Sequence, residues 1–383
     1  MKALRSGVSL EDILVFIRED DNAVLPARDI TPEPVTTDLT LLANAAVEAP
    51  GQTVCAQMSL DIVDDRPFVD LSASFWTTVT DDDEFVSHLI SSWIAWDSLS
   101  CHYTDVDIFV EAMKQKDQLF CSSLLVNSVL ATACHFSSRL TLRSDIQNPN
   151  SFCYRFLKEA ISLWHEEFER PKPTTVQAGM MLCQILACNG SDQLAWMMFQ
   201  TTVSLFEKLR DDVSGPFSRH YQGKHKAGRE DVDIKIEQTI YVTEWAVFRL
   251  SSLFAMTFKY RPRVSIPNTR HPSVSRQDVQ NKEEAVQVNS SGSGIAVLPT
   301  WRPYPYTQPL EPCLASQSVE AASQLCVIIY EFTLLITTDI ESLQPITIKE
   351  KLQLYERLQR WKESLPTGLR MDDNIAPYFA WAK

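Results

Sequence analysis

Histidine, cysteine and clustered aspartate are the residue types in this 383-residue chain that could bind a metal or carry out catalysis. The His165-Glu166-Glu167 sequence resembles the start of a zinc-protease helix, in which a second histidine follows four residues after the first. No histidine stands four residues after His165, so two ligands cannot share one helix face. The motif therefore indicates a solvated helix end rather than a metal site.

The 9 cysteines show no spacing typical of a zinc or redox site. Cys134 precedes His135, but neighbouring residues on a helix point about 100° apart, so this pair is poorly placed to act as nucleophile and base. Cys183 and Cys188 lie in an apolar helical stretch, which favours core packing over metal binding. The odd number of cysteines, mostly in apolar context, predicts reduced thiols in an intracellular protein.

Dense carboxylate runs occur at 64–65 and at 81–83. An all-helical enzyme, such as an isoprenoid-type cyclase, would need clustered aspartates on facing helices to hold Mg²⁺, whereas both runs precede the helical part of the chain. The second run, followed by Glu84, is better explained as a helix N-terminus, where acidic side chains complement the helix dipole. An all-helical enzyme or a scaffold protein stays open as an alternative, but the sequence predicts no catalytic, cofactor-binding or metal-binding residue.

Phosphate-binding loops are also missing from the sequence. It holds only 10 glycines, with no P-loop, no G-x-S-x-G elbow and no glycine-rich turn between a strand and a helix. A basic stretch within 219–229 could meet phosphate or serve as a nuclear-import signal, but its dilution by other residues favours a solvated loop.

Charge and hydropathy argue against three further classes of protein: direct DNA binders, secreted proteins and membrane proteins. The net charge is −14, and the first hundred residues hold five basic and eighteen acidic side chains, which is unlike the basic surface that binds DNA. The apolar run near the N-terminus has charges close on both sides, so we expect no signal peptide. We take 176–188 as the longest apolar stretch, which is too short to span a bilayer. These features predict a soluble intracellular protein without membrane contact.

Apolar periodicity near 3.6 residues predicts an all-α fold of antiparallel helix pairs, and 45% hydrophobic residues are ample for a large core. Period-two alternation is never long enough to predict a sheet. The predicted helices cover 8–20, 85–96, 106–113, 119–142, 152–169, 174–188, 193–209, 236–260, 316–343 and 347–364.

Several stretches, taken in order, resemble the fungal-specific transcription factor domain, the middle homology region of zinc binuclear cluster regulators. The most telling is TTVQAGMMLCQILACNGSDQLAWMMF at 174–199, with its Thr-Val-Gln start, polar turn and Ala-Trp opening of the partner helix. The segment at 4–20 is similar to a pre-domain helix of the nitrate-regulator-like branch. The other matching stretches are 124–139, 152–164, 245–266, 301–305, 354–366 and 374–377.

The resemblance gives a division of the chain. We expect a pre-domain helix at 1–20, an acidic and mostly disordered linker at 21–83, and the helical domain core at 84–264. A loop at 265–314 would then lead to C-terminal helices of the same domain at 315–383, apparently truncated. The sequence departs from the family pattern at Gln200, Thr202, Ser204, Ser251 and Tyr260, and it lacks the C-x2-C-x6-C zinc cluster.

The resemblance also implies a function. It implies a nuclear, non-catalytic regulator of RNA polymerase II transcription that acts through protein or effector contacts and meets DNA only indirectly, with no cofactor in this chain. Transcriptional co-regulators or related zinc-cluster factors would be its partners, in a homodimer or heterodimer. If a metabolite-binding cavity exists between the helices, four tryptophans are the residues expected to line it, although core packing is the stronger expectation for each: Trp96, Trp164, Trp196 and Trp245.

Overall fold

A computed structural model describes part of the chain in detail. The described residues are 66–137, 139, 148–211, 230–268, 300–301, 303–305, 311–312, 315–342, 347–366 and 369. The chain divides into two compact units, Met1–Asp61 and Ile62–Lys383, and all described residues belong to the second. The predicted helix at 8–20, the linker up to residue 65, most of the loop at 211–233 and the segment after 369 lie outside the described residues.

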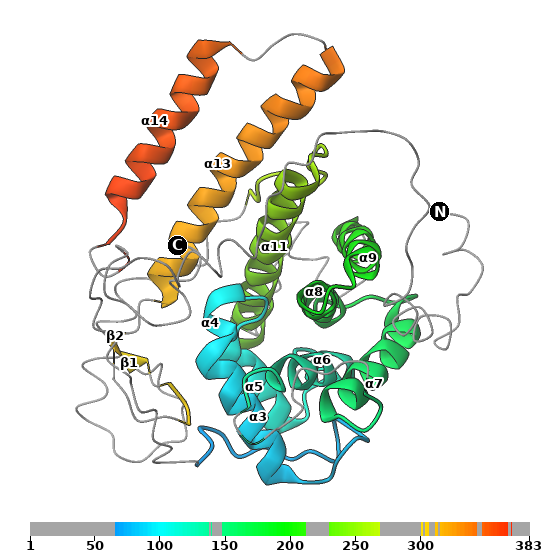
Figure 1. The fold of residues 1–383 in the computed structure, drawn as a ribbon. Helices are drawn as coiled ribbons and strands as arrows, with labels where there is room; N and C mark the ends of the chain where they lie inside the picture. Colours follow the sequence, from blue (N-terminus) through cyan, green and yellow to red (C-terminus); the bar gives the residue numbers. More distant parts are fainter. Residues whose placement is uncertain are drawn as a thin grey trace, which may run out of the picture. The chain divides into compact units, whose positions relative to one another are not determined.

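The described residues confirm the all-α class (Figure 1). Their helices are α3 (Asp83–Trp96), α4 (Ser98–Cys101), α5 (Val106–Gln115), α6 (Ser123–Ala133), α7 (Phe152–Glu167), α8 (Pro173–Cys188), α9 (Asp192–Asp211), α11 (Glu230–Phe258), α13 (Ala315–Ser342) and α14 (Ile348–Ser364). Two short strands, β1 (Thr300–Trp301) and β2 (Glu311–Pro312), pair antiparallel over two residues each. Most helices begin and end within a few residues of the predicted positions.

Side-chain caps explain several of these helix starts. Asp82, Ser122 and Ser151 each accept a hydrogen bond from the backbone N–H three residues later, at the first turn of α3, α6 and α7. The acidic run at 81–83 therefore works as a helix N-terminus, as its position in the sequence predicted. Pro173 opens α8, where the missing N–H of proline is not needed, so this helix begins one residue before the predicted cap.

The helix predicted at 119–142 is shorter in the structure. Ser122 is extended and caps α6, so Phe120 and Cys121 precede the helix, although both are buried. At the other end, α6 stops at Ala133 and passes into a turn. Apolar periodicity continued past both ends because the flanking residues are also buried, and burial alone does not define a helix.

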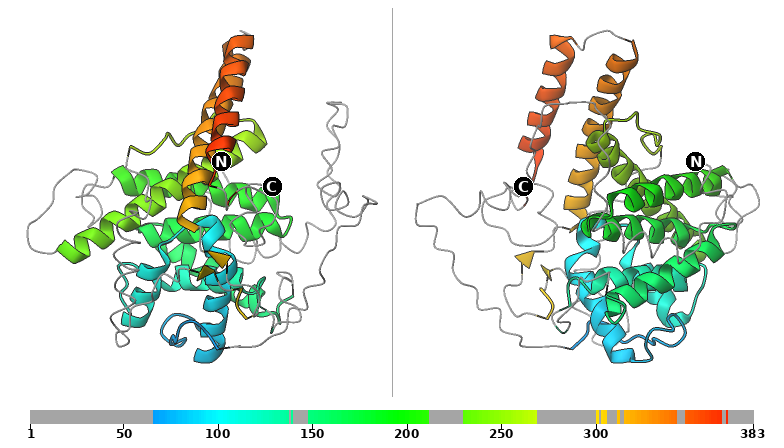
Figure 2. Two further views of the ribbon diagram at one scale, coloured as in Figure 1. Left: turned by 90° about the vertical axis from the view of Figure 1, so that its left-hand side faces the viewer. Right: turned by 45° about the vertical axis from the view of Figure 1, so that its right-hand side comes forward.

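The core is built around α6. All its residues except Ser123 are buried, and the helix packs against α3, α7 and α8. The short turn at 189–191 joins α8 to α9 as antiparallel neighbours, and α11 packs against both α8 and α13 (Figure 2). The predicted antiparallel pairs are therefore present, with α6 and α8 as the buried centre.

The segment before α3 corrects the predicted linker boundary. Residues 66–82 pack on the helices, and Trp76 is only 2% exposed, with its Nε1 donating to the carbonyl of Met113. Thr77 donates to the side chain of Asn127 on α6, and the Leu71 N–H donates to Ser87 on α3. Proline, threonine and aspartate between brief apolar runs suggested disorder, but Val69, Leu71, Ala73 and Trp76 are buried.

Helix α13 contradicts the prediction that 176–188 is the longest apolar stretch. Its segment Ser316–Thr337 is long and apolar enough to cross a membrane, by length and composition only, with a mean hydropathy of 1.6. Serine, threonine and glutamine interrupt it, which is why the more uniform run at 176–188 seemed longer. In the structure this helix lies between α11 and α14, with 28% of the apolar window buried.

Candidate functional site

The four tryptophans expected around a possible effector cavity occupy different surroundings. Trp164 is buried beside Gly179 and Thr202, where α7, α8 and α9 meet. Trp245 is buried on α11 with its ring edge-on to Phe248. Both are buried core residues, Trp164 at 5% and Trp245 at 8% exposure.

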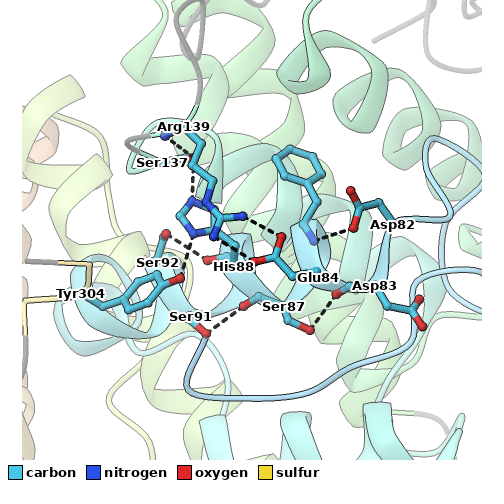
Figure 3. A network of polar contacts seen from close by, with 11 residues as sticks. Asp82, Asp83, Glu84, Ser87, His88, Ser91, Ser92, Ser137, Arg139 and Tyr304 are labelled. Atoms are coloured by element: carbon cyan, nitrogen blue, oxygen red, sulfur yellow. Dashed lines mark hydrogen bonds and ion pairs between the residues drawn. The ribbon is translucent and has the colours of Figure 1, made fainter. Parts of the chain in front are cut away.

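Trp96 contacts Tyr304, which belongs to a polar network centred on His88 of α3; Figure 3 shows that network around His88 and Tyr304. Trp96 and His88 both hold the segment 303–305, because the Trp96 Nε1 donates to the carbonyl of Tyr304 at 2.6 Å and the Tyr304 hydroxyl lies 2.8 Å from His88 Nδ1. Tyr304 is fully buried, and its ring packs on Phe68 at 5.0 Å between centroids. A residue more than two hundred positions along the chain thus completes the outer side of α3.

The second ring nitrogen of His88 is also engaged. Its Nε2 lies 2.9 Å from the Ser137 hydroxyl, and the same hydroxyl accepts from the Arg139 backbone N–H at 3.3 Å. The Arg139 guanidinium closes the network by pairing with both carboxylate oxygens of Glu84 (Figure 3). Since both hydroxyls can donate or accept, the network suits a neutral imidazole in either tautomer. It positions chain segments and presents no free nucleophile.

Serines give α3 its polar interior face. Ser87, Ser91 and Ser92 are buried, and each hydroxyl donates to the carbonyl four residues earlier (Figure 3). Ser87 and Ser91 also accept the backbone N–H groups of Leu71 and Phe68. These short side chains let the segment 66–82 lie directly on the helix.

A second polar cluster lies where α4, α11 and α13 meet. The buried Arg249 guanidinium donates to the carbonyls of Cys101 and His102 and to the Ser323 hydroxyl, at 3.1–3.2 Å. Burial lowers the pKa of Arg249, and burial followed by the nearby Arg249 charge lowers the pKa of His102 to about 4. The cluster therefore joins three helices through one buried cation beside a neutral histidine.

Asp97 anchors the same region to α8. Its carboxylate accepts from Trp93 Nε1 and from Gln184 Nε2, each at 3.1 Å, and Cys101 Sγ lies 3.7 Å away. Burial raises the pKa of the carboxyl, and it raises the pKa of the Cys101 thiol well above its usual range. A neutral thiol is a poor nucleophile, so this grouping is structural.

The cysteine–histidine pair considered in the sequence has a different partner in space. His135 Nε2 lies 3.8 Å from Cys153 Sγ of α7, so the contact runs between elements and not between the adjacent residues Cys134 and His135. Cys153 also donates to the carbonyl of Ala131, and burial raises the pKa of the Cys134 thiol well above its usual range. Spacing along one helix could not reveal this contact. The thiols of Cys134 and Cys153 are buried, which argues against a catalytic role for this contact.

Trp196 lies in an aromatic cluster between α9 and the end of α11. Its ring contacts Phe254 in a stacked arrangement and Tyr260 edge-on, with centroids 6.2 and 5.0 Å apart. The buried hydroxyls of Ser251 and Tyr260 lie close to each other, and neither has another hydrogen-bond partner among the described residues. Ser251 and Tyr260 are two of the positions that depart from the family pattern, and the structure brings Tyr260 against Trp196.

Metal ligands do not cluster in the described part of the chain. No group of three or more His, Cys, Asp or Glu residues within it could hold a metal ion. The sequence and the described structure thus point to a helical domain stabilised by buried polar contacts.

Comparison with known proteins identifies that domain. The family described as fungal specific transcription factor domain matches residues 97–363. The chain belongs to this family. No solved structure matches the chain.

Three curated relatives of this chain are named as transcription regulators. It is similar to the nitrogen assimilation transcription factor nirA of Emericella nidulans, with 27% identity over 80% of this chain and 32% of nirA. It is also similar to the notoamide biosynthesis transcriptional activator notL′ of Aspergillus versicolor, with 30% identity over 56% of this chain and 32% of notL′. A third relative, the nitrogen assimilation transcription factor nit-4 of Neurospora crassa, is 30% identical over 32% of this chain and 12% of nit-4.

The chain spans about a third or less of the length of these relatives. The resemblance to the nitrate-regulator-like branch is confirmed, since two of the three are nitrogen assimilation factors. The matched range, 97–363, includes helices on both sides of the loop at 265–314. These comparisons support transcription regulation and give no support to the enzyme alternative.

Sequence reasoning missed the residues that connect distant parts of the domain. Arg249 and Tyr304 lie in the matching stretches 245–266 and 301–305, and His88 lies in none, but no pattern assigned any of the three a partner. One available signal was their setting, because a histidine and an arginine each sit among apolar residues of a helix and need polar partners there.

Proposed function

We propose that this chain is the regulatory module of a nuclear fungal transcription regulator and that it acts on RNA polymerase II transcription through protein contacts. The family match over 97–363 carries the proposal. Transcriptional co-regulators or related zinc-cluster factors are the proposed partners. The acidic balance of the first hundred residues supports contact with DNA through another protein instead of directly.

A tethering experiment tests this function. The full chain is fused to an unrelated DNA-binding domain in a fungal host, and transcription of a reporter carrying the matching sites is measured. A change of at least about threefold in either direction, compared with the DNA-binding domain alone, supports regulation (roughly 0.6 kcal/mol in promoter occupancy). Reporter output equal to that of the DNA-binding domain alone, from a fusion that accumulates in the nucleus, would contradict it.

Metabolite sensing at the Trp196 cluster is a second candidate. The supporting observation is that the buried hydroxyls of Ser251 and Tyr260 lie close to each other beside the half-buried Trp196 and have no other hydrogen-bond partner among the described residues. Such groups suit a small ligand with an apolar body and one or two polar atoms. A thermal-shift screen of nitrogen metabolites and secondary metabolites tests it, with Ser251→Ala as the matched variant that should lose any shift. A flat response across the screen would remove the sensing role.

A further inference from the structure

Thr80 directly precedes the four acidic residues at 81–84, where α3 begins. All four acidic residues are exposed, and residues 78–82 lie outside any helix or strand. A hydroxyl followed at once by several carboxylates is the substrate pattern of an acid-directed protein kinase, that is, one whose substrate groove is basic and attracts negative charge. The acidic residues that begin α3 therefore also mark the hydroxyl in front of them.

The hydrogen bonds of this segment distinguish Thr80 from the two threonines before it. Thr77 is buried and donates to a side chain of α6. Thr78 is exposed, but its hydroxyl and its backbone N–H both donate to the Glu159 carboxylate, at 2.7 and 2.9 Å. The Thr80 hydroxyl accepts from the Asp82 N–H at 3.2 Å and donates to no acceptor in the described part of the chain. Its proton is therefore free to leave when a phosphate is transferred.

An arginine lies beside the same segment. Arg155 is exposed on α7, and its guanidinium donates to the carbonyl of Val79, one residue before Thr80, at 2.6 Å. The guanidinium also lies over the Phe152 ring, 5.4 Å from the centroid. Among the described residues it forms no ion pair with a carboxylate. Because arginine binds phosphate oxygens strongly, this side chain offers a partner for a phosphate on the neighbouring threonine.

From these observations we propose that Thr80 is the phosphorylation site of an acid-directed protein kinase and that Arg155 binds the phosphate. In the transfer, Thr80 Oγ1 attacks the γ-phosphorus of MgATP, the bond from that phosphorus to the bridging oxygen of ADP breaks, and the hydroxyl proton passes to a base of the kinase. The product carries about 1.5 to 2 negative charges at neutral pH. Pairing of the phosphate with Arg155 then ties the start of α3 to α7.

Phosphorylation of the purified full chain tests the acceptor. Casein kinase II, an acid-directed kinase, is supplied with MgATP, and mass spectrometry follows phosphate at Thr80 and Thr78 over time. A reference acidic peptide shows that the enzyme is active. We expect Thr80 to be modified at least about tenfold faster than Thr78, because the Thr78 proton is held by Glu159. No phosphate at Thr80, or equal rates at the two threonines, would overturn the assignment.

Removal of charge tests how the kinase recognises the site. Asp82→Asn combined with Asp83→Asn keeps both side-chain acceptors, because asparagine also caps helices and accepts from backbone N–H groups. This double variant should lower the rate at Thr80 by at least about fivefold. Glu166→Gln combined with Glu169→Gln removes the same charge at exposed positions near the end of α7 and should change the rate by less than about twofold. An unchanged rate in the aspartate variant would exclude recognition through the acidic residues.

Hydrogen–deuterium exchange tests the role of Arg155. Phosphorylation of Thr80 should slow amide exchange at 79–82 by roughly threefold to tenfold, because the phosphate pairs with the guanidinium. Arg155→Gln should abolish this slowing, whereas Arg170→Gln, the same change at an exposed position just after α7, should leave it intact. Circular dichroism confirms that each variant is folded. Equal slowing in the Arg155→Gln chain would show that the phosphate is not bound by this arginine.

Discussion

At the scale of single residues, the interior of this domain is specified by polar side chains with assigned partners. Asn127 on α6 accepts from Thr77 and donates to the carbonyl of Trp76, which fixes the segment before α3. His88 and Arg249 similarly bind segments that are far apart in sequence. Because a buried polar group that loses its partner is expensive, such residues define which segments belong together.

Gly179 marks the tightest helix contact. A Cβ atom added there would lie 2.3 Å from the Thr202 hydroxyl and 2.7 Å from the Trp164 ring. We expect Gly179→Ala to lower the free energy of unfolding by about 1–3 kcal/mol, because neither neighbour is a flexible chain end. Urea unfolding followed by tryptophan fluorescence measures the loss. Ser204→Ala, at an exposed position of α9, is the control and should change little.

The hydroxyl of Tyr304 is expected to matter more than its exposed counterparts. Tyr304→Phe removes the oxygen 2.8 Å from His88 Nδ1 in a fully buried site, which should destabilise the domain by about 1–3 kcal/mol. The same change at the exposed Tyr355 should have an effect below about 0.5 kcal/mol. Equal unfolding midpoints for the two variants would show that the network contributes nothing to stability.

His102 should make the domain sensitive to mild acid. Its pKa in the folded chain is about 4, below the value of 6.5 in an unfolded chain, so the unfolded state binds the proton first as pH falls. The stability that this residue contributes is complete above pH 6.5 and is lost between pH 6.5 and 4. His102→Asn should flatten that decline by roughly 1–3 kcal/mol, while asparagine still tolerates the left-handed backbone at this position.

Unfolding free energies at pH 7.5, 5.5 and 4.5 provide the measurement for this pH effect. His165→Asn is the control, since His165 is exposed on α7. If the two variants show the same pH dependence, His102 is not the group responsible.

At the scale of elements, sequence reasoning worked well because helix periodicity and capping are local. The apolar stripe of α7 and the Pro173 start of α8 can be seen within one turn of chain. The failures have a different origin. Phe120 and Cys121 are buried outside a helix, and Trp76 is buried in a segment of linker-like composition, so in both places tertiary contacts override the local pattern.

Helix α14 should depend on its capping box more than any buried helix does. It has no buried residues, so Thr347→Ala removes part of what holds its first turn. We expect amide exchange at 348–351 to accelerate by roughly threefold to thirtyfold, which corresponds to about 0.5–2 kcal/mol of local stability. Hydrogen–deuterium exchange with mass spectrometry measures this, and the amides of α6 serve as the internal control and should be unchanged.

At the scale of the whole molecule, the order of the helices could be predicted but their assembly could not. The short turn at 189–191 indicated from the sequence that α8 and α9 are antiparallel neighbours. Nothing local indicated that Arg249 of α11 would bind the end of α4, or that Tyr304 would lie on α3. Trp96 donates to Tyr304, 208 positions away, whereas Trp245 contacts Phe248 on its own helix, and spacing along the chain did not indicate that difference.

Truncation from the N-terminus should show where the folded domain begins. A chain starting at residue 66 retains Trp76, Thr77 and their contacts, and we expect it to unfold cooperatively. A chain starting at residue 84, the predicted domain boundary, loses both the Asp82 cap and the buried Trp76, and it should be unstable or insoluble, since a lost tryptophan alone removes about 3–5 kcal/mol. Thermal unfolding of the two chains compares them, and equal midpoints would restore the boundary at 84.

The contact between His88 and Tyr304 also has a consequence for biosynthesis. The two residues are 216 positions apart, and ribosomes add about 5–20 residues per second, so His88 emerges roughly 10–40 s before the tyrosine that covers it. During that interval His88 and Trp96 of α3 lack their contacts with Tyr304. Chaperones that bind nascent chains are expected to engage this domain until residue 304 has left the exit tunnel.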